Sequence, residues 1–172
     1  MTLSPKTFAR VTLASFVALS LPFAIAAAAD APSPRADASP LLGRWAVDTS
    51  RLPMPPQQRP RSVLFTFGKA DGGKWATQVD IVHANGEVVH SVSTAALDGS
   101  PAPIENSPEA DSLALKQPAP NVLVMALRKG DVLASTRIYA MAPDGQTLIE
   151  TAVYPGQDGS PVMKTSYFRR VR

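Results

Sequence analysis

The chain has 172 residues, with 17 basic and 14 acidic side chains and no cysteine. The absence of cysteine excludes disulfides, thiolate metal sites, a cysteine nucleophile and a lipid anchor attached to cysteine. Charges of both signs are interspersed along the chain, whereas a nucleic-acid binder needs a concentrated basic face, so the composition argues against a nucleic-acid partner.

Residues 1–29 have the three-part layout of a secretory signal peptide. The basic residues Lys6 and Arg10 precede a long apolar run without charge, which ends in four alanines. A retained membrane helix is the alternative interpretation, but Ser20 and Pro22 interrupt the run and no basic cluster follows it. We therefore predict export to a bacterial periplasm or to the medium, with cleavage and no stable membrane anchor in the mature protein.

The predicted mature chain contains a short linker and one domain. Residues 30–40 are rich in proline, alanine and serine and show no apolar periodicity, which predicts a disordered linker. Residues 41–172 contain no segment of helical length with apolar residues at helical spacing. Instead, short alternating runs are separated by turn signals, which is typical of an all-β sandwich or barrel.

Nine of these runs are the expected strands. They are Leu42–Val47, Ser62–Phe67, Lys74–His83, Glu87–Leu97, Ser112–Lys116, Asn121–Arg128, Asp131–Met141, Thr147–Tyr154 and Met163–Arg170. Nearly every link between them has hairpin length, which predicts an antiparallel meander. An open meander exposes two edges, and closure into a barrel removes them. The pattern therefore predicts one closed β-barrel of about eight or nine strands, with a β-sandwich as the alternative.

Two links carry more specific signals. Asn85-Gly86 has alternating flanks and predicts a two-residue type I′ hairpin, because both central positions of that turn need a positive φ. Ser107 followed by Pro108 resembles a helix start, with a capping serine before a proline at the first helical position. We expect a single helical turn there, before the strand at Ser112.

The start and the end of the domain resemble the lipocalins and other calycins. Gly43-Arg44-Trp45 resembles the Gly-x-Trp opening of these proteins, and the last expected strand contains two arginines, Arg169 and Arg170. The resemblance implies that Trp45 packs at the closed end of a barrel, under a basic residue from the last strand. Arg170 is the candidate for that basic residue.

A wider pattern is similar to a group of exported bacterial lipocalin-like proteins of unassigned function. It consists of Gly43-Arg44-Trp45, the proline-rich stretch that follows, residues 98–101, residues 106–111 and Ala114-Leu115-Lys116. The similarity covers about residues 41–172. It implies a small β-barrel and supplies no activity.

The two histidines are the side chains that titrate near neutral pH. In the expected hairpin, His83 pairs with Val88 and His90 with Ile81, so the two histidines share a face within reach of one metal ion. No acidic residue of the hairpin shares that face, and a third ligand would have to come from a distant strand. Two solvent-facing histidines near the hairpin tip are the simpler interpretation, and we predict no metal site and no cofactor.

Catalytic signatures are missing from the sequence. It contains no Gly-x-Ser-x-Gly elbow and no phosphate-cradling glycine loop. Glu150 is a carboxylate in the middle of an expected strand. It is either a pocket carboxylate or a solvated residue paired across the sheet with a base such as Lys164. We predict no catalytic residue and no enzymatic activity.

Apolar residues line one face of two expected strands. Phe65 and Phe67 share a face of the second strand, and Trp75, Val79 and Ile81 share a face of the third. Such residues either fill a small barrel completely or leave room for one small apolar ligand. These five residues are the candidate interior of a binding site.

A proline-rich segment joins the first two expected strands. Residues 52–60 contain four prolines, which favours an extended polyproline conformation. In lipocalins the loop at this place folds over the mouth of the barrel. Leu52 and Met54 are therefore candidate lid residues, and a passive surface loop is the alternative.

These observations favour an exported small β-barrel that binds a small hydrophobic molecule without forming a covalent bond. One alternative is a structural or interaction module of the cell envelope, with a solid core and no ligand. A lesser alternative is an enzyme that uses His83 and His90. An internal cavity is the feature that distinguishes the first two hypotheses.

Overall fold

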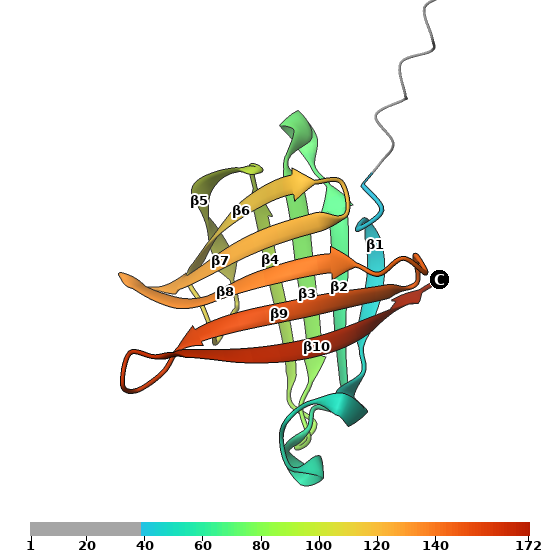
Figure 1. Ribbon diagram of the computed structural model, residues 1–172, viewed down its shortest axis with the longest axis vertical. Coiled ribbons are helices and arrows are strands. Elements are labelled where there is room, and N and C mark those ends of the chain that lie inside the picture. The colour runs from blue at the N-terminus through green and yellow to red at the C-terminus, as the bar shows by residue number, and fades with distance from the viewer. Residues whose placement is uncertain (1–38) are drawn as a thin grey trace, which may run out of the picture. The chain divides into compact units, whose positions relative to one another are not determined.

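The computed structural model describes residues 39–172, and the predicted signal peptide and most of the predicted linker lie outside the described residues. Within this part of the chain, ten strands form a closed antiparallel barrel (Figure 1). The strands are β1 (Gly43–Val47), β2 (Ser62–Lys69), β3 (Trp75–Val82), β4 (Val88–Ala95), β5 (Asp98–Glu105), β6 (Ser112–Ala119), β7 (Val122–Lys129), β8 (Val132–Met141), β9 (Thr147–Pro155) and β10 (Pro161–Val171). Each strand pairs with its neighbours in sequence, and β10 pairs with β1 to close the sheet. The predicted meander barrel is confirmed, and the sandwich alternative is wrong.

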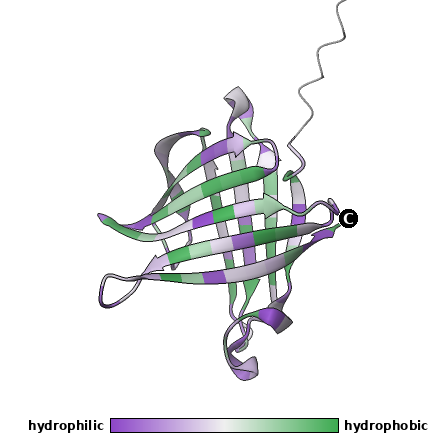
Figure 2. Cartoon of the chain, in the orientation of Figure 1, coloured by the Kyte–Doolittle hydropathy of each residue, from purple (hydrophilic) through white to green (hydrophobic). Residues whose placement is uncertain are grey.

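Alternation along the strands explains why the sheet closes. Hydrophobic and hydrophilic residues follow one another along the strands (Figure 2). In β7 the burial alternates strictly from Val122 to Leu127, because successive side chains point to opposite faces. One face of every strand is thus available to a shared interior. No helix among residues 39–172 is long and apolar enough to cross a membrane.

The strand that the sequence pattern missed is β5. It contains Pro101 and Pro103, which lack the N–H group that a sheet ladder uses, and the segment is not among the nine expected strands. The structure tolerates the prolines because β5 pairs with β4 only near its end, at Ile104 and Glu105. Its pairing with β6 is also interrupted by a register shift between Asp98 and Pro101.

The predicted helical turn at Ser107 is wrong. Residues 107–110 form bends and not a helix. The capping chemistry is nevertheless present, because the Ser107 hydroxyl accepts hydrogen bonds from the backbone N–H groups of Glu109 and Ala110, each at 3.3 Å. The serine therefore shapes the β5–β6 connection without starting a helix.

The β3–β4 hairpin differs from the prediction by one residue in register. The His83 N–H donates to the Glu87 carbonyl, and Gly86 alone within the loop has a positive φ, of 91°. This is a three-residue loop and not a two-residue type I′ turn. His90 therefore lies opposite Asp80, and not opposite Ile81. Because side chains alternate between faces, a shift of one residue exchanges the interior and exterior positions of β4.

One end of the barrel is closed around Trp45, which is fully buried. Its indole N–H donates to the Leu41 carbonyl at 2.8 Å. Arg170 lies directly opposite on β10, with its guanidinium carbon 4.1 Å from the centroid of the Trp45 ring. The same guanidinium donates to the Leu42 carbonyl at 2.9 Å. Of the arginines near the C-terminus, it is Arg170 that covers the tryptophan.

An aromatic cluster continues the core from this end. Phe67 contacts Trp75 and Tyr139, each with ring centroids 5.6 Å apart. Phe65 contacts Phe168 edge to face, at 5.2 Å. Such edge-on contacts are the preferred geometry for aromatic pairs. The cluster fills the closed half of the barrel with side chains.

The first testable prediction concerns Gly43, which precedes Trp45 by two residues. Gly43 has φ +119°, and a Cβ atom there would lie 2.9 Å from the Arg170 Nη1 atom. We expect Gly43→Ala to lower the free energy of unfolding by about 1–3 kcal/mol, through backbone strain and displacement of the guanidinium. Urea denaturation measures this change.

Gly68→Ala is the matched control. Gly68 also lies in a strand of the barrel, but a Cβ atom there would meet the Ala76 Cβ at an ordinary 3.8 Å. We expect this variant to be as stable as the wild type or slightly more stable. Equal losses of stability in the two variants would contradict the role given to Gly43.

Candidate functional site

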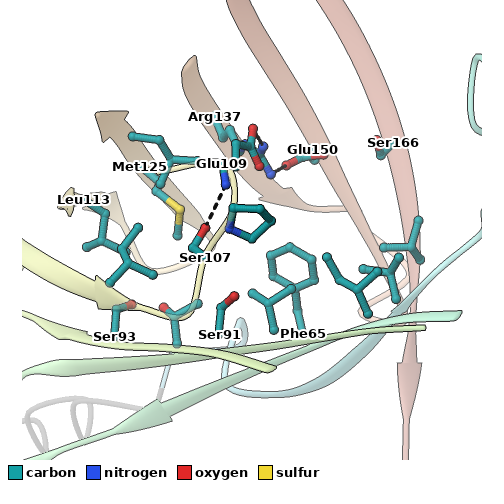
Figure 3. A pocket seen from close by; sticks show the side chains of 18 of the residues that line it. Phe65, Ser91, Ser93, Ser107, Glu109, Leu113, Met125, Arg137, Glu150 and Ser166 are labelled. Atoms are coloured by element: carbon teal, nitrogen blue, oxygen red, sulfur yellow. Dashed lines mark hydrogen bonds and ion pairs between the residues drawn. The ribbon is translucent and has the colours of Figure 1, made fainter. Parts of the chain in front are cut away.

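The end of the barrel opposite Trp45 contains a pocket of about 340 Å³. In a closed meander the odd-numbered links lie at one end, so the β1–β2, β3–β4, β5–β6, β7–β8 and β9–β10 connections all lie at this open end. Most of the walls come from apolar side chains, including Val47, Val63, Phe65, Leu113, Met125 and Phe168. Figure 3 shows the pocket between the strands that carry Phe65, Met125 and Ser166. The aromatic cluster forms its floor.

Five of the seven predicted ligand-site residues line this pocket. Phe65 projects from β2, and Val79 and Ile81 project from β3. Leu52 and Met54 reach the pocket from the β1–β2 connection, which lies at the bottom of the view in Figure 1. These residues therefore lie around one pocket at the open end of the barrel.

Phe67 and Trp75 do not line the pocket. Both are buried, with 2% and 3% of their surface exposed, but they lie in the aromatic cluster at the closed end. They share a face with Phe65 and Val79, as predicted, and differ from them in height along the barrel. Alternation in the sequence gives the face of a residue but not its depth, so this distinction required the structure.

The β1–β2 connection is not the continuous extended segment that its prolines predicted. It contains two short 3-10 helices, η1 (Thr49–Arg51) and η2 (Pro56–Gln58). Arg51 lies 3.5 Å from the centroid of the Tyr167 ring on β10, which attaches the connection to the barrel wall. The Arg59 side chain donates to the Met54 carbonyl at 3.0 Å. These contacts hold Leu52 and Met54 over the pocket.

Hydroxyl groups make one wall more polar than the sequence pattern predicted. Because of the register shift, Ser91 and Ser93 face the interior, opposite Val79 and Thr77 of β3. The Ser91 hydroxyl donates to the Asn106 carbonyl at 3.0 Å. The Thr77 hydroxyl is buried and has no hydrogen-bond partner among the described residues. An unpaired buried hydroxyl is costly unless water or a ligand satisfies it.

A charged cluster lies in the opposite wall. Arg137 of β8 forms ion pairs with Glu109 of the β5–β6 connection and with Glu150 of β9, the second at 3.3 Å. Glu150 is only 6% exposed and lines the pocket. Of the two alternatives for Glu150, the structure shows the pocket carboxylate. Lys164 lies opposite Ala152 in the sheet and does not form an ion pair with Glu150. Figure 3 shows Arg137 directed toward both carboxylates.

The cluster keeps Arg137 charged. Burial alone would lower the pKa of Arg137, but the neighbouring Tyr139, Glu150, Glu109 and Tyr154 together raise it above its ordinary value. The pKa of Tyr139 is also raised, first by burial and then by the negative charge of Glu150. The cluster therefore contains a permanent cation and a protonated phenol at neutral pH.

Sequence reasoning could have found part of this cluster. Glu150 was identified as a mid-strand carboxylate, and a charged residue within an alternating strand is a signal in itself. Arg137 gives the same signal on β8, between Ser135 and Tyr139, and was overlooked. Glu109 gives none, because it lies in an irregular connection whose path depends on the whole barrel.

The two histidines do not form the shared site considered above. His90 lies opposite Asp80 and its Nδ1 atom is hydrogen bonded to the Asp80 carboxylate. His83 is three residues from Asp80, an odd spacing, so His83 and His90 lie on opposite faces of the hairpin. The expectation that both share a face without an acidic neighbour is wrong, and the one-residue register shift is the reason.

The contact between His90 and Asp80 allows a second prediction, on acid stability. Burial alone would raise the pKa of Asp80, but hydrogen bonds from His90 and Gln78 outweigh it and lower the pKa. A carboxyl with a lowered pKa contributes stability above its unfolded-state pKa of about 3.9, and this stability is lost as the pH falls through the folded-state pKa. We expect His90→Ala to raise the Asp80 pKa in an NMR titration and to reduce the stability lost in acid.

His83→Ala is the control for this titration, because His83 lies on the other face of the hairpin. It should leave the Asp80 pKa unchanged. If both variants shifted the Asp80 pKa equally, or neither did, the described His90–Asp80 contact would be incorrect.

Comparison with known proteins adds no assignment to this geometry. The sequence matches no protein-family model and no curated protein. The closed antiparallel barrel is compatible with a lipocalin-like fold, and it has ten strands in the described part where about eight or nine were expected.

Proposed function

We propose that this protein is an exported lipocalin-like barrel that binds a small, mostly apolar molecule non-covalently in the pocket at its open end. The pocket itself is the observation that carries the proposal. Its volume of about 340 Å³ lies in the lower part of the range typical of small-molecule sites, roughly 300–1,000 Å³. The signal-peptide pattern of residues 1–29 supports export to a bacterial periplasm or to the medium.

The lining explains how such a ligand would be held. Aliphatic and aromatic side chains from strands on opposite sides of the barrel face the same space, so the barrel walls would shield an apolar ligand from water. Each Å² of apolar surface removed from water contributes about 25 cal/mol. Affinity of this kind needs no covalent chemistry and no cofactor. Leu52 and Met54 would cover the bound molecule from the mouth.

Filling the pocket provides the test. Ser93 lines the pocket from β4 and makes no side-chain hydrogen bond within the described part of the chain. We expect Ser93→Phe to weaken binding of decanol at least about tenfold, because the new ring occupies the space of the ligand. Isothermal titration calorimetry on the full mature protein measures the affinity.

Thr94→Phe is the matched control, since Thr94 is the next residue of β4 and its side chain is exposed. The same substitution on the outer face should leave decanol binding unchanged. If both variants bind decanol as tightly as the wild-type protein does, the pocket is not the binding site and the proposed carrier function is wrong.

One observation favours a second candidate function, the binding of another protein. Val88, Val132 and Met163 are each about two thirds exposed, and all three lie next to connections at the open end. Exposed apolar residues mark an interaction surface where they form a contiguous patch, and Val132 and Met163 lie on β8 and β10, which are separated by one strand. Val132→Lys and Met163→Lys should then release a partner co-purified from the native envelope and leave decanol binding unchanged.

A further inference from the structure

The charged cluster in the pocket wall has more acceptors than donors to offer a ligand. Each guanidinium nitrogen of Arg137 already donates to the protein. Nε donates to the Ser135 hydroxyl at 3.4 Å, Nη1 to Glu150 at 3.3 Å, and Nη2 to Glu109 and to the Tyr154 hydroxyl. Four of the five guanidinium N–H groups are therefore engaged by the protein, and one N–H of Nη1 is left for a ligand acceptor.

The two carboxylates keep oxygen atoms that Arg137 does not contact. Arg137 contacts Oε1 of Glu109 and Oε1 of Glu150 and does not contact either Oε2 atom. The other described donor beside Glu150 is the buried Tyr139 hydroxyl. Two carboxylates and one guanidinium leave one excess negative charge when all three are ionised. Only 6% of Glu150 is exposed, so solvent screens this charge weakly.

A second feature of the pocket favours a hydrogen-bonding ligand. The Thr77 hydroxyl lines the same pocket, on a residue that is only 6% exposed, and no described residue pairs with it. A hydroxyl both donates and accepts, so it suits a ligand with N–H or O–H groups. A purely hydrocarbon ligand would leave this group and the free carboxylate oxygens without partners.

We infer that the pocket selects an amphiphile with a cationic ammonium head group and discriminates against carboxylates. This inference rests on the proposed binding function. The apolar walls would hold the hydrocarbon part, and the ammonium would lie beside the free oxygens of Glu109 and Glu150. A fatty acid would bring a second negative charge next to Glu150, whose charge solvent screens weakly, and such like-charge contacts are costly.

Three decyl compounds that differ only in the head group provide the test. Decylamine is cationic at pH 7, decanol is neutral and decanoate is anionic. Isothermal titration calorimetry on the mature protein, below the micelle concentrations of the compounds, measures each affinity. We expect decylamine to bind at least about tenfold more tightly than decanoate, with decanol between them.

Charge-neutralising variants assign the selectivity to the cluster. Glu109→Gln combined with Glu150→Gln keeps the shapes and leaves Arg137 as the single charge, so the preference should reverse toward decanoate. Glu109→Gln alone, at a more exposed position, should reduce the preference and provides a second readout if the double variant does not fold. Glu105→Gln changes an exposed carboxylate outside the pocket lining and should have no effect.

The outcomes separate this inference from the function on which it rests. Binding of decanoate as tightly as decylamine would overturn the head-group selectivity and leave the carrier function standing. A preference for decylamine that the double variant retains would overturn the role of the two carboxylates. Failure of all three compounds to bind would remove the carrier function and the selectivity together.

Discussion

Trp45→Ala should lower the free energy of unfolding by about 3–5 kcal/mol, the range for removing a large buried aromatic side chain. Trp45 is fully buried, its indole N–H donates to the Leu41 carbonyl, and the Arg170 guanidinium lies over its ring. The substitution removes all three contributions and opens a cavity at the closed end of the barrel. Arg170 would also lose the aromatic face that it covers. Urea denaturation followed by circular dichroism measures the change.

Trp45→Phe separates packing from the polar contacts. The phenyl ring keeps most of the apolar burial but leaves the Leu41 carbonyl without its side-chain donor. We expect a loss of about 1–2 kcal/mol, clearly smaller than that of the alanine variant. If Trp45→Ala cost less than about 1 kcal/mol, the closed end could not be packed as described.

Arg137→Met should also lower the free energy of unfolding by about 3–5 kcal/mol at neutral pH, because it leaves a buried carboxylate without its countercharge. Glu150 is the group at risk, since it is only 6% exposed and Arg137 is its ion-pair partner. Glu109 is exposed to solvent and would tolerate the loss. Chemical denaturation at neutral pH measures the effect.

The double variant Arg137→Met with Glu150→Met shows what the ion pair contributes. Replacing both partners of a buried pair by apolar side chains is often neutral or stabilising, so we expect most of the lost stability to return. In that case the pair would serve the chemistry of the pocket more than the stability of the fold. A double variant as unstable as Arg137→Met alone would contradict this.

Arg128→Met is the matched control for these variants. Arg128 also pairs with an acidic residue, Asp131, but at 3.9 Å and at the surface, with about half of its side chain exposed. Surface pairs of this kind contribute at most about 1 kcal/mol. A loss comparable to that of Arg137→Met would show that burial is not the cause of the larger effect.

Local sequence rules predicted most of the strands and their order, because a barrel of hairpins is built from contacts between neighbouring segments of the chain. Alternating runs bounded by glycine turns identified nine of the ten described strands and their antiparallel order. The strand that was not predicted is β5. It contains two prolines, and its place in the sheet depends on the strands on either side. The register of the β3–β4 hairpin was also predicted wrongly, because one additional loop residue, Ala84, exchanges the two faces of β4.

The amino-acid sequence by itself determined that the domain is an antiparallel β-barrel and which face of β2 and β3 turns inward, because alternation and turn chemistry act over a few residues. Only the tertiary structure decided that side chains fill the closed half and leave a pocket in the other. It also brought Glu109, Arg137 and Glu150 together from three separate elements. A cavity and a charged cluster depend on the depth of each side chain along the barrel, and that depth is set by the stagger of all the strands once the sheet has closed.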